Sequence, residues 1–202
     1  PISCMVSPLH INKGWFNMVF WKNVVGVLAI GLFAVTGFGC GSAQNAAQHD
    51  VWRVGTDASY APFGFQDESS HEYVGYDIDI IRAIAASQGH EVTIKNLNFD
   101  GLIPALQTGD LDIAISDMTI NEDRSRTVDF TDSYYKAGLS IVVRADETRI
   151  NNFDDLRGMH VGVTIGSTGA EVARAIPNAD LHEFSTISDA FLDLYNGGVD
   201  AV

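Results

Sequence analysis

Cysteine is almost absent from this sequence of 202 residues. Only Cys4 and Cys40 occur, so nothing after residue 40 can form a disulfide within that part of the chain or a thiolate metal site. Basic residues are also few, with 12 Lys and Arg against 26 Asp and Glu, and the formal net charge is -14. This acidic balance argues against nucleic acid or an anionic membrane surface as a partner.

Long apolar runs are missing too, apart from one near the N-terminus. Residues Val24 to Phe38 are predominantly apolar and uncharged, and they follow Lys22. This run is shorter than the ~20 residues of a membrane span and is typical of a signal-peptide core. We therefore predict that residues 1–49 are a signal peptide and flexible tether, with no clear element in residues 1–17, and we leave them out of the fold.

Cys40 and the polar stretch after it resemble a lipoprotein attachment site with its tether. Small Gly39 fits that pattern, whereas Gly37 and Phe38 depart from the residues usual at those places. Lipid attachment at Cys40, ordinary cleavage near Ala43 to Ala47 and an uncleaved anchor are the three alternatives. Each of them places the rest of the chain outside the cytoplasm, in the periplasm or on the outer face of the cell membrane.

Strand and helix patterns alternate after Asp50, which predicts a parallel sheet covered by helices. Asp77 is a candidate helix cap, and glycines are expected to end the helices at Gly89 and Gly109. Ligands of such sheets lie beyond the carboxyl ends of the strands. The predicted strands and helices, in chain order, are VWRVGT, IDIIRAIAASQG, HEVTIKNL, LIPALQTG and LDIAIS in the first part, and MHVGVTIGSTG, AEVARAI and TISDAFLDLYNGG in the second.

Five separated segments carry a resemblance to the bacterial extracellular solute-binding proteins of family 3, the polar amino-acid receptors of ABC importers. The resemblance covers the chain from Val51 to Val202. The segments are VGTDASYAPFGF (54–65), YVGYDIDI (73–80), NFDGLIPALQTGDLDIAISDMTINEDR (98–124), VDFTDSYYKAG (128–138) and VGVTIGSTG (161–169).

This resemblance implies a periplasmic-binding-protein-like α/β fold with two lobes joined by a hinge. We place the first part of lobe 1 at residues 50–137, the hinge at Tyr134 to Gly138 and lobe 2 at residues 138–202. Relatives continue beyond this point, so lobe 2 and the return to lobe 1 are expected to be incomplete. The implied protein is a monomer without cofactor or metal that delivers an amino acid to an ABC permease.

The resemblance also implies the contacts of a zwitterionic ligand. Arg124 stands five residues after Thr119, and its planar guanidinium suits a carboxylate bidentately. Ser167 and Thr168, in a loop that opens a helix, match carboxylate contacts from the second lobe. Without the matched motif, Arg124 in its polar run would be interpreted as a solvent-exposed charge. The glycine loop at residues 166–169 would be interpreted as a simple turn.

The ligand's side chain is expected to lie among acids and aromatic rings. Tyr60 and Phe99 match flanking aromatics, although core packing is the plain alternative for Phe99. Asp57 matches an acid at the ligand's side chain and otherwise reads as a turn cap. Asp117 replaces the small residue usual at its place, where it either substitutes for a missing contact to the ligand's α-ammonium or favours a cationic side chain. Thr164 holds a variable specificity position. Together these residues favour a basic or amide amino acid.

Two other functions remain open at this stage. A few proteins similar to this family are exported cyclohexadienyl dehydratases acting on prephenate or arogenate, and the same domain occurs fused to membrane sensors. The sequence contains no HExxH, GxSxG or P-loop motif. His71, His90, His160 and His182 are scattered and read as separate surface residues. We therefore predict a binding protein that is not an enzyme.

Overall fold

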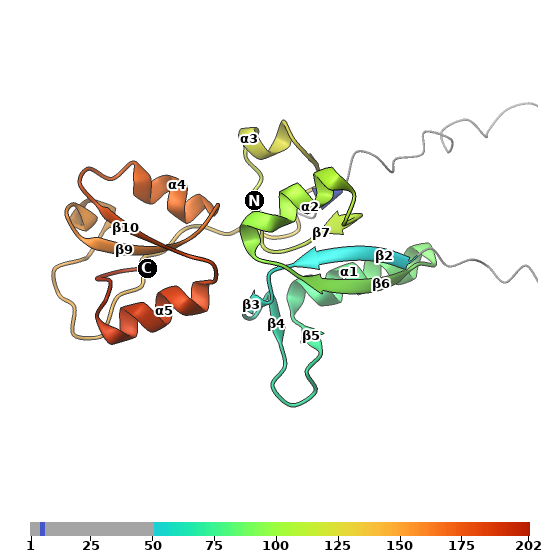
Figure 1. Ribbon diagram of the computed structural model, residues 1–202, viewed down its shortest axis with the longest axis horizontal. Coiled ribbons are helices and arrows are strands. Elements are labelled where there is room, and N and C mark those ends of the chain that lie inside the picture. Colours follow the sequence, from blue (N-terminus) through green and yellow to red (C-terminus); the bar gives the residue numbers. More distant parts are fainter. Residues whose placement is uncertain (1–4, 7–50) are drawn as a thin grey trace, which may run out of the picture.

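The protein is described by a computed structural model that covers Met5, Val6 and residues 51–202. Figure 1 shows two α/β bodies side by side, joined by the chain that leaves the first body after β8 (Asp129–Phe130). In this part of the chain no helix has the length and apolar character needed to cross a membrane. Apart from Met5 and Val6, the predicted signal peptide and tether, including Cys40, lie outside the described residues.

The first body is built on a five-stranded sheet with the order β6-β2-β7-β1-β8. Strand β2 (Val51–Thr56) pairs in parallel with β6 (Glu91–Asn96) and with β7 (Ile113–Ala114). These strands occupy positions that the sequence predicted, although β7 is shorter than its apolar segment. The backbone N–H groups of Asp112 and Ile115 nevertheless bond to β2 carbonyls, so the parallel pairing extends past the named strand.

Helices α1 (Tyr76–Gln88) and α2 (Leu102–Thr108) cover opposite faces of this sheet. Successive residues of a strand point to opposite faces, so two neighbouring residues of β2 identify the helix on each face. Val54 packs with Ile81 of α1, whereas a Cβ on the adjacent Gly55 would meet Leu102 of α2. Both helices end at a left-handed glycine, Gly89 and Gly109, as predicted. The sheet therefore lies between two apolar layers, with its strand ends facing the second body.

The N-terminal residues contribute an unexpected strand, β1 (Met5–Val6). It lies antiparallel between β7 and β8 and pairs with both. The prediction that residues 1–17 contain no element was wrong at this point. A strand of two residues is too short to show the alternating pattern by which a strand is recognised in a sequence.

Gly55 of β2 packs closely against Leu111 and against Leu102 of α2, and this packing allows a stability test. A Cβ there would lie 2.2 Å from a Leu111 methyl group. We expect Gly55→Ala to lower the free energy of unfolding by about 1–3 kcal/mol, because overpacking shifts neighbours from their rotamers. Gly101→Ala is the matched control, since Gly101 has open space and a helical φ of -82°. Urea denaturation measures both, and equal stabilities would contradict the packing.

A small antiparallel sheet connects β2 to α1. It consists of β3 (Ser59–Tyr60), β4 (Gly64–Gln66) and β5 (Tyr73–Val74), and Figure 1 shows it extending away from the main sheet. Its first strand follows directly on the carboxyl end of β2. Tyr60 is therefore held at the edge of the first body that faces the second.

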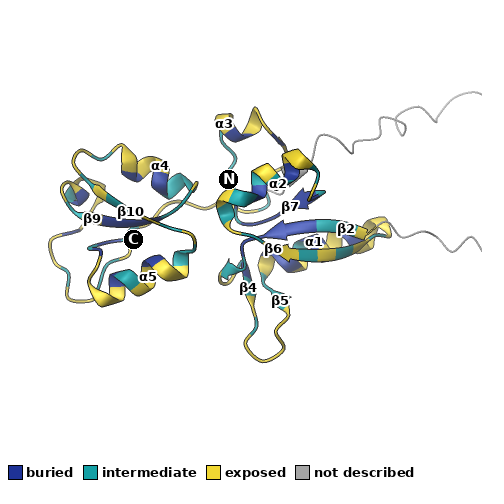
Figure 2. Cartoon of the chain, viewed as in Figure 1, coloured by how far each residue is buried: buried dark blue, intermediate teal, exposed yellow. Residues whose placement is uncertain are grey.

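The second body has a two-stranded parallel sheet, β9 (His160–Thr164) and β10 (Asp180–Phe184). Helices α4 (Thr168–Arg174) and α5 (Ile187–Asn196) pack against both strands, and a short 3₁₀ helix, η3 (Phe153–Leu156), precedes them. The chain then returns at Ala201, which bridges Val161 in parallel and Val143 antiparallel. Figure 2 shows the buried residues gathered on the strands and on the inner sides of these helices.

Candidate ligand-binding cleft

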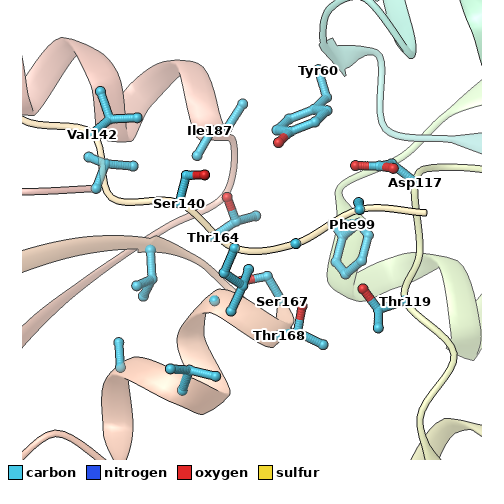
Figure 3. A pocket seen from close by; sticks show the side chains of 18 of the residues that line it. Tyr60, Phe99, Asp117, Thr119, Ser140, Val142, Thr164, Ser167, Thr168 and Ile187 are labelled. Atoms are coloured by element: carbon cyan, nitrogen blue, oxygen red, sulfur yellow. The ribbon is translucent and has the colours of Figure 1, made fainter. Parts of the chain in front are cut away.

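A cavity of about 810 Å³ lies between the two bodies and takes residues from both. Figure 3 shows Asp117, Phe99 and Thr119 on the side of the first body, facing Thr164, Ser167 and Thr168 of the second. All nine residues that the sequence singled out line this one cavity. They are Asp57, Tyr60, Phe99, Asp117, Thr119, Arg124, Thr164, Ser167 and Thr168.

The two bodies touch at both rims of the cavity. On one rim Arg124 Nη2 donates to the carbonyl of Gly166 at 2.8 Å, and Asn121 reaches the Glu171 carboxylate at 3.5 Å. On the other rim the Ser188 hydroxyl lies 3.4 Å from the carbonyl of Ser59. The cavity therefore lies in a cleft between two bodies that contact each other directly.

Arg124 is positioned by a short helix of four residues, α3 (Glu122–Ser125). Asn121 caps this helix, accepting the backbone N–H of Arg124 at 2.9 Å. Nη1 donates to the carbonyl of Thr119 at 2.8 Å, and the guanidinium carbon lies 5.4 Å from the centre of the Phe99 ring. These contacts hold the guanidinium plane at the cavity wall, with only 7% of the residue exposed.

The charge of Arg124 is incompletely compensated within the protein. Burial lowers its pKa, and the nearby Glu171 raises it less. Two of the five guanidinium N–H groups bind the carbonyls of Thr119 and Gly166. Among the described residues, no hydrogen bond is seen for the other N–H groups. Such a buried guanidinium is a natural partner for an anion that enters the cavity, and a carboxylate matches its flat geometry.

The second body presents hydroxyl groups opposite Arg124. Ser167 caps α4, its Oγ accepting the backbone N–H of Ala170 at 3.1 Å. Gly166 precedes it with a φ of 74°, a conformation that glycine adopts readily. Figure 3 shows the side chains of Thr168 and Thr119 on facing walls, and Thr164 at the end of β9 above them. Hydroxyls and helix amides thus complete a polar region around the guanidinium.

Asp117 lies at the other end of the cavity with one carboxylate oxygen unused. Its Oδ1 is buried without a hydrogen-bond partner among the described residues, and its backbone φ is 49°. Burial, and secondarily the charge of Asp77, raise the pKa of Asp117 to about 7. Figure 3 shows Tyr60 on the same side of the cavity as Asp117, with its hydroxyl pointing into the cavity. Burial, and then Asp117, raise the pKa of Tyr60 as well.

Asp77 supports the site and does not cap α1, so that prediction was wrong. Gly75 occupies the cap position, and Asp77 lies fully buried in the first turn. Its two oxygens accept the backbone N–H of Asp117 at 2.8 Å and the hydroxyl of Tyr134 at 2.7 Å. Burial raises the pKa of Asp77, while these two hydrogen bonds lower it. The acid therefore ties the Asp117 loop to the start of the crossing between the bodies.

Asp57 makes the turn-capping contact that was one of the two alternatives for it. Its Oδ1 accepts the backbone N–H of Ser59 at 3.1 Å, which is the turn-capping contact. Its own backbone N–H donates to the Ser116 hydroxyl at 2.9 Å. The residue is nevertheless part of the cavity wall, with the unpaired Ser59 hydroxyl beside it.

Four aromatic residues of the cavity wall were missed by the sequence reasoning, namely Phe63, Tyr135, Phe153 and Phe191. Phe63 and Tyr135 line the cavity and meet edge to face with ring centres 5.1 Å apart. Phe63 also lies 6.1 Å from Tyr60. Tyr135 lies inside the predicted hinge, and Phe63 follows the predicted site residue Tyr60 by only three residues. These sequence positions could have indicated that both rings lie in the cavity wall. The rings form a continuous apolar wall near Asp117.

The architecture is that of a two-lobed solute-binding protein, with an arginine and hydroxyls at one end of the cleft and carboxylates among aromatic rings at the other. Residues 52–202 match the family model of the bacterial extracellular solute-binding proteins, family 3. The chain belongs to this family.

Two curated relatives illustrate the similarity. A protein of Campylobacter jejuni named probable histidine-binding protein is 35% identical over 150 residues, covering 74% of this chain and 58% of the relative. The arginine-binding extracellular protein ArtP of Bacillus subtilis is 34% identical over 146 residues, covering 71% of this chain and 55% of the relative. The chain therefore spans little more than half the length of these two proteins.

Solved structures agree with the fold. An ancestral arginine-binding protein bound to arginine is 45% identical with a TM-score of 0.72, covering 75% of this chain and 68% of that one. An ancestral amino-acid-binding protein described as a precursor of cyclohexadienyl dehydratase is 41% identical with the same TM-score, over 75% of this chain and 68% of that one. The predicted periplasmic-binding-protein-like α/β class is confirmed.

Proposed function

We propose that this chain is the substrate-binding component of an ABC importer, and that it captures a basic or amide L-amino acid between two closing lobes for delivery to a membrane permease. The main observation behind this proposal is that one cleft is lined by a buried arginine and by a buried carboxylate oxygen that has no hydrogen-bond partner among the described residues. These groups are complementary to the two ends of a cationic amino acid. The names of the relatives, histidine- and arginine-binding proteins, support the same ligand class.

The ligand's carboxylate is assigned to Arg124. Removing a carboxylate from water costs several kcal/mol unless it is paired and hydrogen-bonded. Arg124 and Thr119 supply this from the first lobe, and Ser167 and Thr168 from the second. Because the guanidinium already bridges to Gly166, a bound carboxylate adds a second link between lobes. Closure then stabilises the occupied state, which the permease can distinguish from the empty one.

The ligand's cationic end is assigned to Asp117, with Asp57 and Thr164 beside it. A cation near Asp117 Oδ1 satisfies an oxygen that otherwise lacks a partner, which removes a penalty of about 1–3 kcal/mol. The faces of Tyr60 and Phe99 attract a cationic group further. Arginine, lysine, histidine and glutamine are the amino acids that these contacts accommodate.

The remaining parts of the proposal concern the whole protein. We propose an exported monomer, held at the membrane by a lipid on Cys40, with lobes at residues 50–137 and 138–202 and a hinge at Tyr134 to Gly138. We propose that it catalyses no reaction, because the relatives are named as binding proteins. Incubation with prephenate or arogenate tests this, since formation of the aromatic product would identify a dehydratase.

A ligand screen tests the binding proposal. We expect arginine, lysine, histidine or glutamine to raise the melting temperature of the chain, and aspartate and leucine to leave it unchanged. The physical reason is that a ligand bound only by the folded state stabilises it by mass action. Titration calorimetry then measures Kd for each responding amino acid. Stabilisation by aspartate or leucine, with none by the basic and amide amino acids, would contradict the ligand class.

A further inference from the structure

Two histidines that the sequence reasoning treated as separate come together in the second lobe. Strands β9 and β10 are parallel, with Asp180 opposite His160. His182 follows Asp180 by two residues and therefore points to the same face of the sheet. One ring nitrogen of each histidine and a carboxylate oxygen of Asp180 all lie within 4.8 Å of one another. Among the described residues, these are the three side chains whose possible metal-binding atoms lie close enough together to hold one ion.

The distances suit a single first-row metal ion. His160 Nδ1 lies 3.0 Å from Asp180 Oδ2, and His182 Nε2 lies 3.9 Å from the same oxygen. Ligands bound tetrahedrally at 2.0–2.1 Å from Zn²⁺ are separated by about 3.3 Å. The two imidazole rings meet at 75° with centres 5.3 Å apart, so they are not stacked against each other. Small side-chain rotations bring the three atoms to tetrahedral spacing.

Two further acidic residues, Asp193 and Asp200, lie beside the histidines of this trio. His182 Nδ1 lies 4.0 Å from Asp193 of α5, so its Nε2 is the nitrogen left for a metal. Such a carboxylate behind a ligating histidine fixes the ring and raises its basicity. The backbone N–H of His160 donates to Asp200 at 3.0 Å, and Asp200 is itself held by Arg149 at 3.1 Å. The start of β9 is thereby fixed.

We propose that His160, Asp180 and His182 bind Zn²⁺, with water as the fourth ligand. Imidazole with one carboxylate favours zinc and its neighbours over Mg²⁺ or Ca²⁺, which prefer oxygen ligands. The three side chains are 54%, 64% and 37% exposed, so the ion enters directly from solvent. His160 and the cleft residue Thr164 are at opposite ends of β9, about 13 Å apart at 3.3 Å per residue. The zinc site is therefore independent of the amino-acid site.

Calorimetric titration of the untagged chain with Zn²⁺, in buffer without amino acids, tests the proposal. We expect one equivalent to bind, and His160→Ala, His182→Ala and Asp180→Asn each to weaken binding at least tenfold. Asp193→Asn is expected to weaken it about tenfold, as loss of a carboxylate behind a ligating histidine does. Mg²⁺ is expected to give no binding heat under the same conditions.

Two matched variants separate this site from others. His71→Asn removes an exposed histidine at a φ of 59° that Asn tolerates, and it should leave zinc binding unchanged. Arg124→Ala should also leave it unchanged, because the cleft is not involved. Circular dichroism without metal checks that each variant is folded. The proposal would be overturned if the parent chain gave no binding heat. It would also be overturned if His182→Ala and Asp180→Asn bound zinc with the same affinity as the parent chain.

Discussion

Replacing Arg124 by alanine is expected to abolish measurable amino-acid binding. Loss of one partner from a buried, hydrogen-bonded charge pair costs about 2–5 kcal/mol of binding free energy, which corresponds to a Kd weakened roughly 30-fold to 4,000-fold. The substitution also removes the link to Gly166 across the cleft, so the closed state loses a contact from the protein itself. Calorimetry with the ligand that stabilises the parent chain most measures the effect.

Arg126 provides the matched control on the same short segment. It is 66% exposed in its side chain and pairs with Glu122 at 2.6 Å and Asp123 at 3.1 Å. Exposed pairs of this kind contribute about 0–1 kcal/mol, so Arg126→Ala should change neither affinity nor stability much. Arg124→Lys keeps the charge but loses the flat double donor, and an intermediate affinity is expected. Equal Kd values for Arg124→Ala and Arg126→Ala would refute the carboxylate assignment.

Much of the fold was predictable because the apolar periodicity is regular. The segments around β2, α1, β6 and α2 carry clear patterns and glycine stops, and they appear where the sequence predicts them. Strand β1 was not predictable, since two residues show no period and their partners are far away in the chain. The shortness of β7 was equally hidden, because the apolar run continues beyond the residues that the strand includes.

The site was predictable only where its residues belong to a spaced motif. Arg124 in isolation reads as a surface charge, and its burial follows from α3, a helix too short to be recognised from its sequence. Asp77 looked like a helix cap because its long-range partners, Asp117 and Tyr134, are 40 and 57 residues away. The pairing of His160 with His182 depends on the parallel register of β9 and β10, which composition does not reveal.

Asp117 gives the cleft a pH dependence whose sign follows from its environment. Its pKa is raised to about 7 in the folded protein, mainly by burial and then by Asp77. A cationic side chain beside it stabilises the ionised form, so ligand binding expels a proton below pH 7. Arginine affinity should therefore be constant above pH 7 and fall by up to about tenfold per pH unit below it. Glutamine has a neutral side chain, and its affinity should change much less.

The same group affects stability in the opposite sense. An acid whose folded pKa lies above its ordinary value of 3.8 favours the folded state when protonated. Its stabilising contribution is present below about pH 4 and is lost as the pH rises to about 7. Asp117→Asn removes the ionisable group, so the variant does not lose stability by this route as the pH rises, and it no longer places a carboxylate beside Asp77. Asn also tolerates the left-handed φ of 49° at this position. The ligand-free variant should therefore melt higher than the parent at pH 8, with a smaller difference at pH 5.5.

Asp117→Asn is expected to weaken arginine binding about tenfold to a hundredfold at pH 8, since a charge-assisted hydrogen bond contributes about 1.5–3 kcal/mol. It should also flatten the dependence of arginine affinity on pH between 5.5 and 8, while glutamine binding is retained. Arginine suits this test because its guanidinium stays protonated throughout. Asp132→Asn, an exposed acid outside the cleft, is the control. An unchanged pH profile in Asp117→Asn would show that another group titrates, and the cationic end of the ligand would then lie elsewhere.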